Sequence, residues 1–120
     1  MTNAPDRYER FVLPEGVSKV TRIKDTRITN AATFEVQRED HTLGNLIRMQ
    51  LHRDPEVLFA GYKAPHPLEY KINFKVQARD TTNPETVFRR AIDAVDTEIA
   101  DLRKAFTEEL ARPRDQGNFY

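Results

Sequence analysis

The last third of the sequence predicts one long amphipathic helix, and this helix constrains the fold more than any other feature. Asn83 suits the N-cap and Pro84 the first helical position, and Pro113 predicts an end near Arg112. Such a helix would be about 42 Å long at 1.5 Å per residue. A compact domain of this size is about 35 Å wide. The helix is therefore at least as long as the domain that carries it.

The apolar residues of this segment form a single stripe. They recur at spacings of four and three: Phe88, Ile92, Val95, Ile99, Leu102 and Phe106. A stripe of this kind usually packs on the protein's own sheet. Its mean spacing of 3.5 residues is also that of the contact between two packed helices. An uncovered stripe would be an exposed apolar patch that favours association with another protein. The length of the helix favours a partner, and both interpretations can hold along one helix.

The rest of the chain predicts a sheet and a shorter helix. Residues 68–79 alternate between apolar and polar side chains, which indicates a half-buried antiparallel strand. Further strands are expected over 18–23, 32–37 and 57–62. A helix should begin at Thr42 as its cap, with Asp40 adding negative charge, and end at Asp54 before Pro55. Its stripe is Leu43, Ile47 and Leu51, widened by Leu46.

The order strand, strand, helix, strand, strand, long helix predicts an α+β domain, with an antiparallel sheet and two helices on one face. We expect residues 1–17 to be an N-terminal anchor segment, in which Tyr8, Phe11, Val12 and Leu13 form one helical turn that ends at Pro14. Residues 18–112 would form the domain. Residues 113–120 would be a flexible tail.

Composition argues against several classes of protein. Lys plus Arg and Asp plus Glu number 19 each, so the net charge is zero, whereas free nucleic-acid binders carry a basic excess and membrane-surface helices a basic face. The first residues lack the apolar run of a secretory signal. The chain has no cysteine, which excludes disulfides and thiolate metal sites.

No pattern of catalytic or metal-binding residues is visible. His41, His52 and His66 form no pair with ligand spacing, and Ser18 is the only serine. The acidic residues of the long helix lie between the apolar residues of its stripe, which is the pattern expected of the solvent-exposed face of the helix. We therefore expect no catalytic residue, no metal and no cofactor. An enzyme on an α+β sandwich and a free nucleic-acid-binding module remain the alternatives from other classes.

A longer motif carries a resemblance to a known family. It contains Asp40, His41, Thr42, Leu43, Gly44 and Asn45, and after a gap Val57, Phe59, Tyr62, His66 and Pro67. This pattern resembles the signature of the small alpha-like subunits of eukaryotic and archaeal RNA polymerases, and the resemblance covers nearly the whole chain. Residues 3–9 and 57–63 look most like the polymerase II branch. The paralogous branch shared by polymerases I and III ranks second.

The resemblance implies a fold and a role. The fold would be that of the dimerisation domain of the bacterial alpha subunit. The chain would be a non-catalytic nuclear subunit that pairs with a larger alpha-like subunit, the third subunit in polymerase II. The pair would be the platform for the two large catalytic subunits in transcription. Other polymerase subunits would be further partners, and neither a specific nucleic-acid contact nor a membrane is implied.

The family also implies where the partner binds. Both helices would form the interface, and the shorter one would contribute Leu43, Gly44, Ile47 and Leu51. The contacts of the long helix follow from its stripe, which runs from Phe88 to Phe106. Gly44 has two interpretations, because a helical glycine costs about 1 kcal/mol and either makes room for another backbone or lies harmlessly in the first turn. Asn45 could return a hydrogen bond to the cap.

Overall fold

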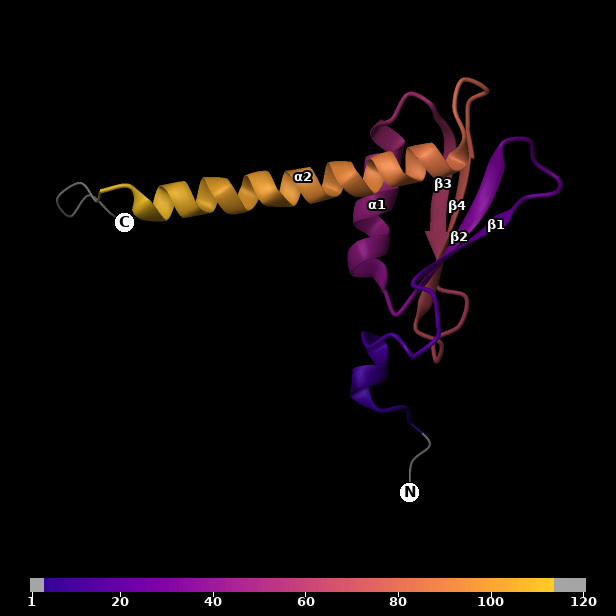
Figure 1. Ribbon diagram of the computed structural model, residues 1–120, viewed down its shortest axis with the longest axis horizontal. Coiled ribbons are helices and arrows are strands. Elements are labelled where there is room, and N and C mark those ends of the chain that lie inside the picture. Colours follow the sequence, from indigo (N-terminus) through magenta and orange to yellow (C-terminus); the bar gives the residue numbers. More distant parts are fainter. Residues whose placement is uncertain (1–3, 114–120) are drawn as a thin grey trace.

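The elements follow the order that the sequence predicts. The computed structural model describes residues 4–113. Figure 1 shows how the elements are arranged. They are a 3₁₀ turn η1 (Arg7–Arg10), strands β1 (Val20–Lys24) and β2 (Ala31–Gln37), helix α1 (His41–Arg53), strands β3 (Val57–Lys63) and β4 (Lys71–Ala78), and helix α2 (Pro84–Ala111).

The four strands form one antiparallel sheet in the order β1-β2-β4-β3. Strands β2 and β4 lie in the centre, where Phe34 pairs with Phe74. Every second side chain is buried along β4 and along β2 from Ala32 onward, and the two helices pack on this apolar face. The predicted α+β class, with two helices on one face of an antiparallel sheet, is confirmed.

Several element boundaries differ from the prediction. Strand β4 begins at Lys71 rather than at Leu68, because the residues before it form a turn in which the Leu68 amide donates to Nδ1 of His66 over 3.0 Å. The prediction that Thr42 caps the first helix was wrong. Asp40 is the N-cap, and its carboxylate accepts a hydrogen bond from the Thr42 amide over 2.9 Å. The Asn45 side chain accepts from Arg48 and not from the cap.

Helix α2 divides into a packed half and a projecting half. Its buried residues are Pro84, Val87, Phe88, Ala91 and Val95, and every residue from 96 to 113 is exposed. The 16 residues from 96 to 111 extend the helix by about 24 Å. The radius of gyration is therefore 18.9 Å, whereas a compact chain of this length would have roughly 14 Å. Figure 1 shows the resulting L shape, with α2 as one arm.

A polar clamp holds the packed half of α2 against the turn between α1 and β3. The Arg90 guanidinium lies 3.1 Å from the Asp54 carboxylate and 3.0 Å from that of Glu56. Glu56 also accepts a hydrogen bond from the Thr81 hydroxyl over 2.7 Å. The Thr81 and Arg90 hydrogen bonds both lower the pKa of Glu56. Because the folded state stabilises its charged form, ionised Glu56 adds to stability.

The clamp predicts a stability difference that depends on pH. The stabilisation from Glu56 is complete above its unfolded pKa of about 4.3 and disappears as the pH falls through its lower folded pKa. Glu56→Gln should therefore lower the melting temperature modestly at pH 7, and this gap should shrink below about pH 4. Thermal unfolding by circular dichroism at pH 7 and pH 3 tests this. A gap of equal size at both pH values would contradict it.

Candidate partner interface

The predicted stripe on α2 is divided between the core and the surface. Phe88, with only 4% of its surface exposed, and Val95 are buried in the chain's own core. The Phe88 ring stacks on Phe34 with centroids 4.2 Å apart. Leu102 and Phe106, by contrast, are 71% and 64% exposed. The two interpretations of the stripe therefore apply to different halves of one helix.

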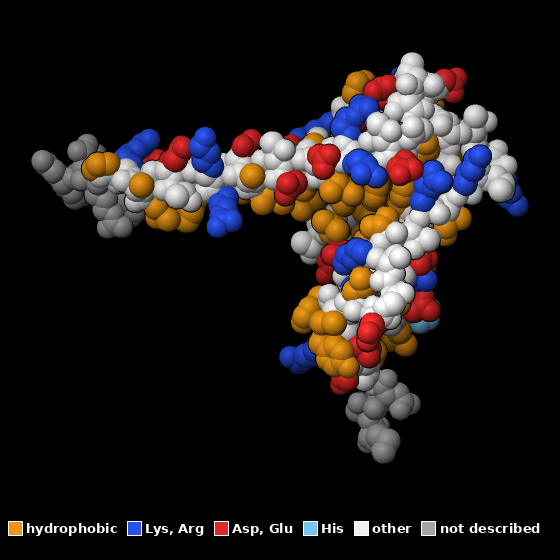
Figure 2. Space-filling view, viewed as in Figure 1, with side chains coloured by type: hydrophobic (Ala, Val, Ile, Leu, Met, Phe, Trp, Pro, Cys, Tyr) orange, Lys and Arg blue, Asp and Glu red, His pale blue; other side chains and the backbone are white. Residues whose placement is uncertain are grey.

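The projecting half keeps the same apolar face, and nothing else within residues 4–113 covers it. Its exposed members are Ile99, Leu102 and Phe106, and Leu110 continues them. Ile92 is also exposed and lies on the packed half. Figure 2 shows apolar side chains along the lower side of this arm, with charged side chains above them. An apolar face of this length, bordered by charges, is typical of a protein-binding surface.

The predicted residues of α1 lie beneath the surface. Gly44, Ile47 and Leu51 are buried, and Leu43 packs against the same core. These residues attach α1 to the sheet, and a direct contact between them and a partner stays a prediction. The exposed apolar residues of α1 are Leu46 and Met49. Sequence reasoning missed Met49, although its spacing of three from Leu46 places the two on one face.

A groove joins the two helices at the corner of the L. Its volume is about 250 Å³. Its apolar lining is Leu46 and Met49 of α1 with Val95, Ile99 and Leu102 of α2. The Arg53 guanidinium lies 2.8 Å from the Glu98 carboxylate and links the two helices beside the groove. The exposed stripe of α2 is therefore continuous with exposed apolar residues of α1.

Three residues of the family motif form one structural unit that docks α1 on β3. Nδ1 of His41 lies 2.7 Å from the Tyr62 hydroxyl, and the Tyr62 ring packs beside Phe74 with centroids 5.8 Å apart. A Cβ atom on Gly44 would lie 2.6 Å from Cε2 of Tyr62. Gly44 therefore makes room for an aromatic ring rather than for another backbone. Nε2 of His52 adds a contact with the Ala60 carbonyl over 2.8 Å.

The other motif residues are spread over the fold. Val57 packs against the core, whereas Phe59 is exposed on the opposite face of the sheet. His66 organises the turn before β4, and Pro67 is exposed beside it. The motif thus consists mostly of residues that shape the domain.

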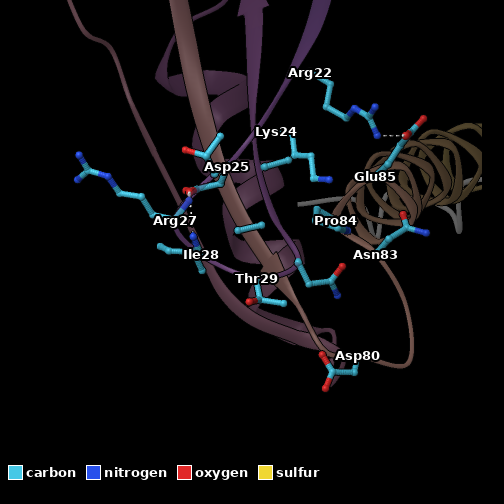
Figure 3. A pocket seen from close by; sticks show the side chains of 14 residues that line it. Arg22, Lys24, Asp25, Arg27, Ile28, Thr29, Asp80, Asn83, Pro84 and Glu85 are labelled. Atoms are coloured by element: carbon cyan, nitrogen blue, oxygen red, sulfur yellow. Dashed lines mark hydrogen bonds and ion pairs between the residues drawn. The ribbon is translucent and has the colours of Figure 1, made fainter.

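Another cavity lies between the β1–β2 hairpin and the start of α2 (Figure 3). It has a volume of about 580 Å³, and no sequence pattern predicted it. Three of the charged side chains that line it make contacts within the chain. The Asp25 carboxylate accepts from the Ile28 and Arg27 amides, which lowers its pKa, and Arg22 pairs with Glu85 over 3.1 Å.

The described residues show two further absences. Between residues 4 and 113, no group of three or more His, Asp or Glu side chains is arranged to hold a metal ion. Within the same range, no helix combines the length and the apolar character that crossing a membrane requires.

Comparisons with known proteins agree with this geometry. Residues 31–105 match the family described as the RNA polymerase Rpb3/Rpb11 dimerisation domain. The chain is 45% identical over 118 residues to DNA-directed RNA polymerase II subunit rpb11 of Dictyostelium discoideum, covering 98% of both chains. It is 39% identical over 107 residues to subunit RPB11 of Schizosaccharomyces pombe, covering 89% of this chain and 86% of that one.

A solved structure shares the fold. DNA-directed RNA polymerase subunit L from Thermoplasma acidophilum aligns with a TM-score of 0.62 at 22% sequence identity. The alignment covers 77% of this chain and 90% of that one.

The contact between Gly44 and Tyr62 predicts that Gly44→Ala changes stability in the opposite direction to the usual one. Inside a helix, Gly→Ala normally stabilises by about 1 kcal/mol, yet Gly44→Ala should destabilise because the new Cβ meets the Tyr62 ring. Chemical denaturation of Gly44→Ala, Tyr62→Ala and the double variant tests this. With Tyr62→Ala already present, Gly44→Ala should become neutral or stabilising. A stabilising Gly44→Ala in the otherwise unchanged chain would refute the steric explanation.

Proposed function

Because the chain belongs to the RNA polymerase Rpb3/Rpb11 dimerisation family, among the Rpb11 subunits of RNA polymerase II, we propose that it pairs with the larger alpha-like subunit Rpb3. It is a non-catalytic subunit of the polymerase. The pair would form the platform on which the two large catalytic subunits assemble for transcription. The place of action would be the nucleus, where polymerase II works.

The observation that carries this proposal is the projecting half of α2. Ile99, Leu102 and Phe106 are exposed along about 24 Å of helix that no other part of residues 4–113 covers. Burying one such side chain fully contributes about 1.5–3 kcal/mol. A partner that covers the whole stripe therefore gains several such contributions, which supports a stable pair rather than a brief encounter.

The contact surface that we propose combines the exposed residues of both helices. It consists of Ile92, Ile99, Leu102 and Phe106 of α2, together with Leu46 and Met49 of α1. The other residues assigned to the interface support this surface from beneath. They are Leu43, Gly44, Ile47, Leu51, Phe88 and Val95.

The family description also suggests how the two subunits meet. If Rpb3 carries the same kind of domain, it too has a long helix that needs a binding site. The groove beside Leu46 and Met49 provides a site for that helix, while the projecting half of α2 would lie on the corresponding groove of Rpb3. Such an arrangement is a two-fold-like interface, in which each subunit offers the same pair of elements.

The uncovered stripe predicts how the isolated chain behaves. Expressed alone, the chain should self-associate or aggregate, whereas co-expression with Rpb3 should give a soluble 1:1 pair. Light scattering after size exclusion measures both. A stable 14.0 kDa monomer with no affinity for Rpb3 would be incompatible with the proposed function.

Leu102 tests the assignment of the projecting half to the partner. Leu102→Glu would place an unpaired charge in an apolar seam, at a cost of several kcal/mol, which corresponds to at least about a hundredfold weaker pairing. The fold of the isolated chain should be unchanged, because Leu102 lies beyond the last buried residue of α2, Val95.

Two comparison variants make this test specific. Phe74→Glu should unfold the domain, since the Phe74 side chain is fully buried. Ile23→Glu should alter neither property, because Ile23 is exposed and pairs with Thr33 on the sheet face away from the helices. Circular dichroism reports folding and a pull-down with Rpb3 reports pairing. If Leu102→Glu pairs normally, or unfolds as Phe74→Glu does, then Leu102 does not contact the partner.

A further inference from the structure

The N-terminal segment presents large apolar side chains to solvent from a defined backbone conformation. Phe11 is 70% exposed, and Tyr8 and Val12 are also exposed. No residue of η1 is buried. The backbone of this turn is nevertheless closed, because the Val12 amide donates to the Tyr8 carbonyl over 2.9 Å. This is the opposite of the usual arrangement, in which apolar side chains hold a terminal segment against its domain.

Polar contacts hold the segment in place. The Arg38 guanidinium donates to the Glu9 carbonyl over 2.6 Å, and the Arg10 guanidinium lies 6.0 Å from the centre of the Tyr70 ring. Arg38 belongs to the connection between β2 and α1 and has a left-handed φ of 58°. The segment is therefore attached to the β2–α1 connection and to the residue that precedes β4.

These contacts are weak compared with the cost of ordering the segment. Fixing one residue's backbone costs about 1–2 kcal/mol, whereas a typical hydrogen bond contributes about 0.5–1.5 kcal/mol net. The three backbone hydrogen bonds within the segment and the two polar contacts with the domain together contribute less than the ordering of eight residues, Asp6 to Leu13, costs. Burial of Tyr8, Phe11 and Val12 against another surface would supply the missing stabilisation.

The position of the segment indicates which surface this is. In Figure 1, η1 lies beyond the N-terminal end of α1, and α2 crosses the other end of α1. Figure 2 shows apolar side chains on the inner side of the L at both places, below the α2 arm and on the N-terminal segment. A domain about 35 Å wide that fills the corner would reach both.

The area of the α2 stripe also indicates that the partner contacts more of the chain than α2. From Val95 to Leu110 the helix runs about 22 Å, and a face about 10 Å wide presents roughly 220 Å². A stable interface usually buries about 800 Å² on each partner. A partner with an interface of that size therefore contacts more than the stripe: it also covers Leu46 and Met49 of α1 and further parts of the chain.

We propose that the segment from Asp6 to Leu13 is a second contact for the same subunit that covers α2, with Tyr8, Phe11 and Val12 buried against it. This inference rests on the proposed function, because the occupant is the larger alpha-like subunit. That subunit lies in the corner of the L and spans from the projecting half of α2 to η1.

Photo-crosslinking in the assembled polymerase identifies the neighbour of the segment. Benzoylphenylalanine in place of Phe11 should crosslink to Rpb3. The same amino acid in place of Ile23, exposed on the far face of the sheet, should not. A crosslink from position 11 only to another subunit, or to none, would overturn the inference.

The affinity of the purified pair provides the energetic test. Phe11→Ser combined with Val12→Ser should weaken pairing by at least tenfold, while Ile23→Ser should leave it unchanged. Equal affinity of the double variant and the unaltered chain would contradict this inference alone. Failure of the unaltered chain to bind Rpb3 would instead contradict the proposed function, so the two failures can be told apart.

Discussion

One helix that is longer than its own domain determines the form of this molecule. Helix α2 packs on the sheet as far as Val95, and its same apolar face then continues into solvent. The first half needs a sheet wide enough to bury Phe88 between Phe34 and Phe74. The second half needs a surface that the described part of the chain does not provide. The domain is therefore built around a helix that it can only half cover.

The other contacts fix the direction of that helix. The Arg90 clamp and the Arg53–Glu98 pair tie α2 to the end of α1. The His41–Tyr62 contact and the space at Gly44 let α1 lie close to β3. Together they set the corner at which Leu46 and Met49 meet Ile99 and Leu102. Rigid positioning matters, because a preformed surface loses less conformational entropy on binding.

Much of the fold could be predicted from the sequence, because periodicity and prolines are local signals. The element order, the sheet class and the span of α2 between Pro84 and Pro113 are confirmed, and so is membership of the polymerase II branch. The division of α2 at Val95 could not be predicted, because its apolar spacing is the same on both sides.

Contacts between residues far apart in the chain could not be predicted from the sequence either. The contact of Gly44 with Tyr62 joins residues that only the docking of α1 on β3 brings together. The exposure of Leu46 and Met49 depends on how α1 rotates on the sheet.

The most direct test of the account is hydrogen exchange along α2. Amides from 96 to 111 should exchange rapidly in the dilute chain and become protected when Rpb3 binds, while those from 87 to 95 are protected in both. Protection of 96–111 that binding does not change would contradict it.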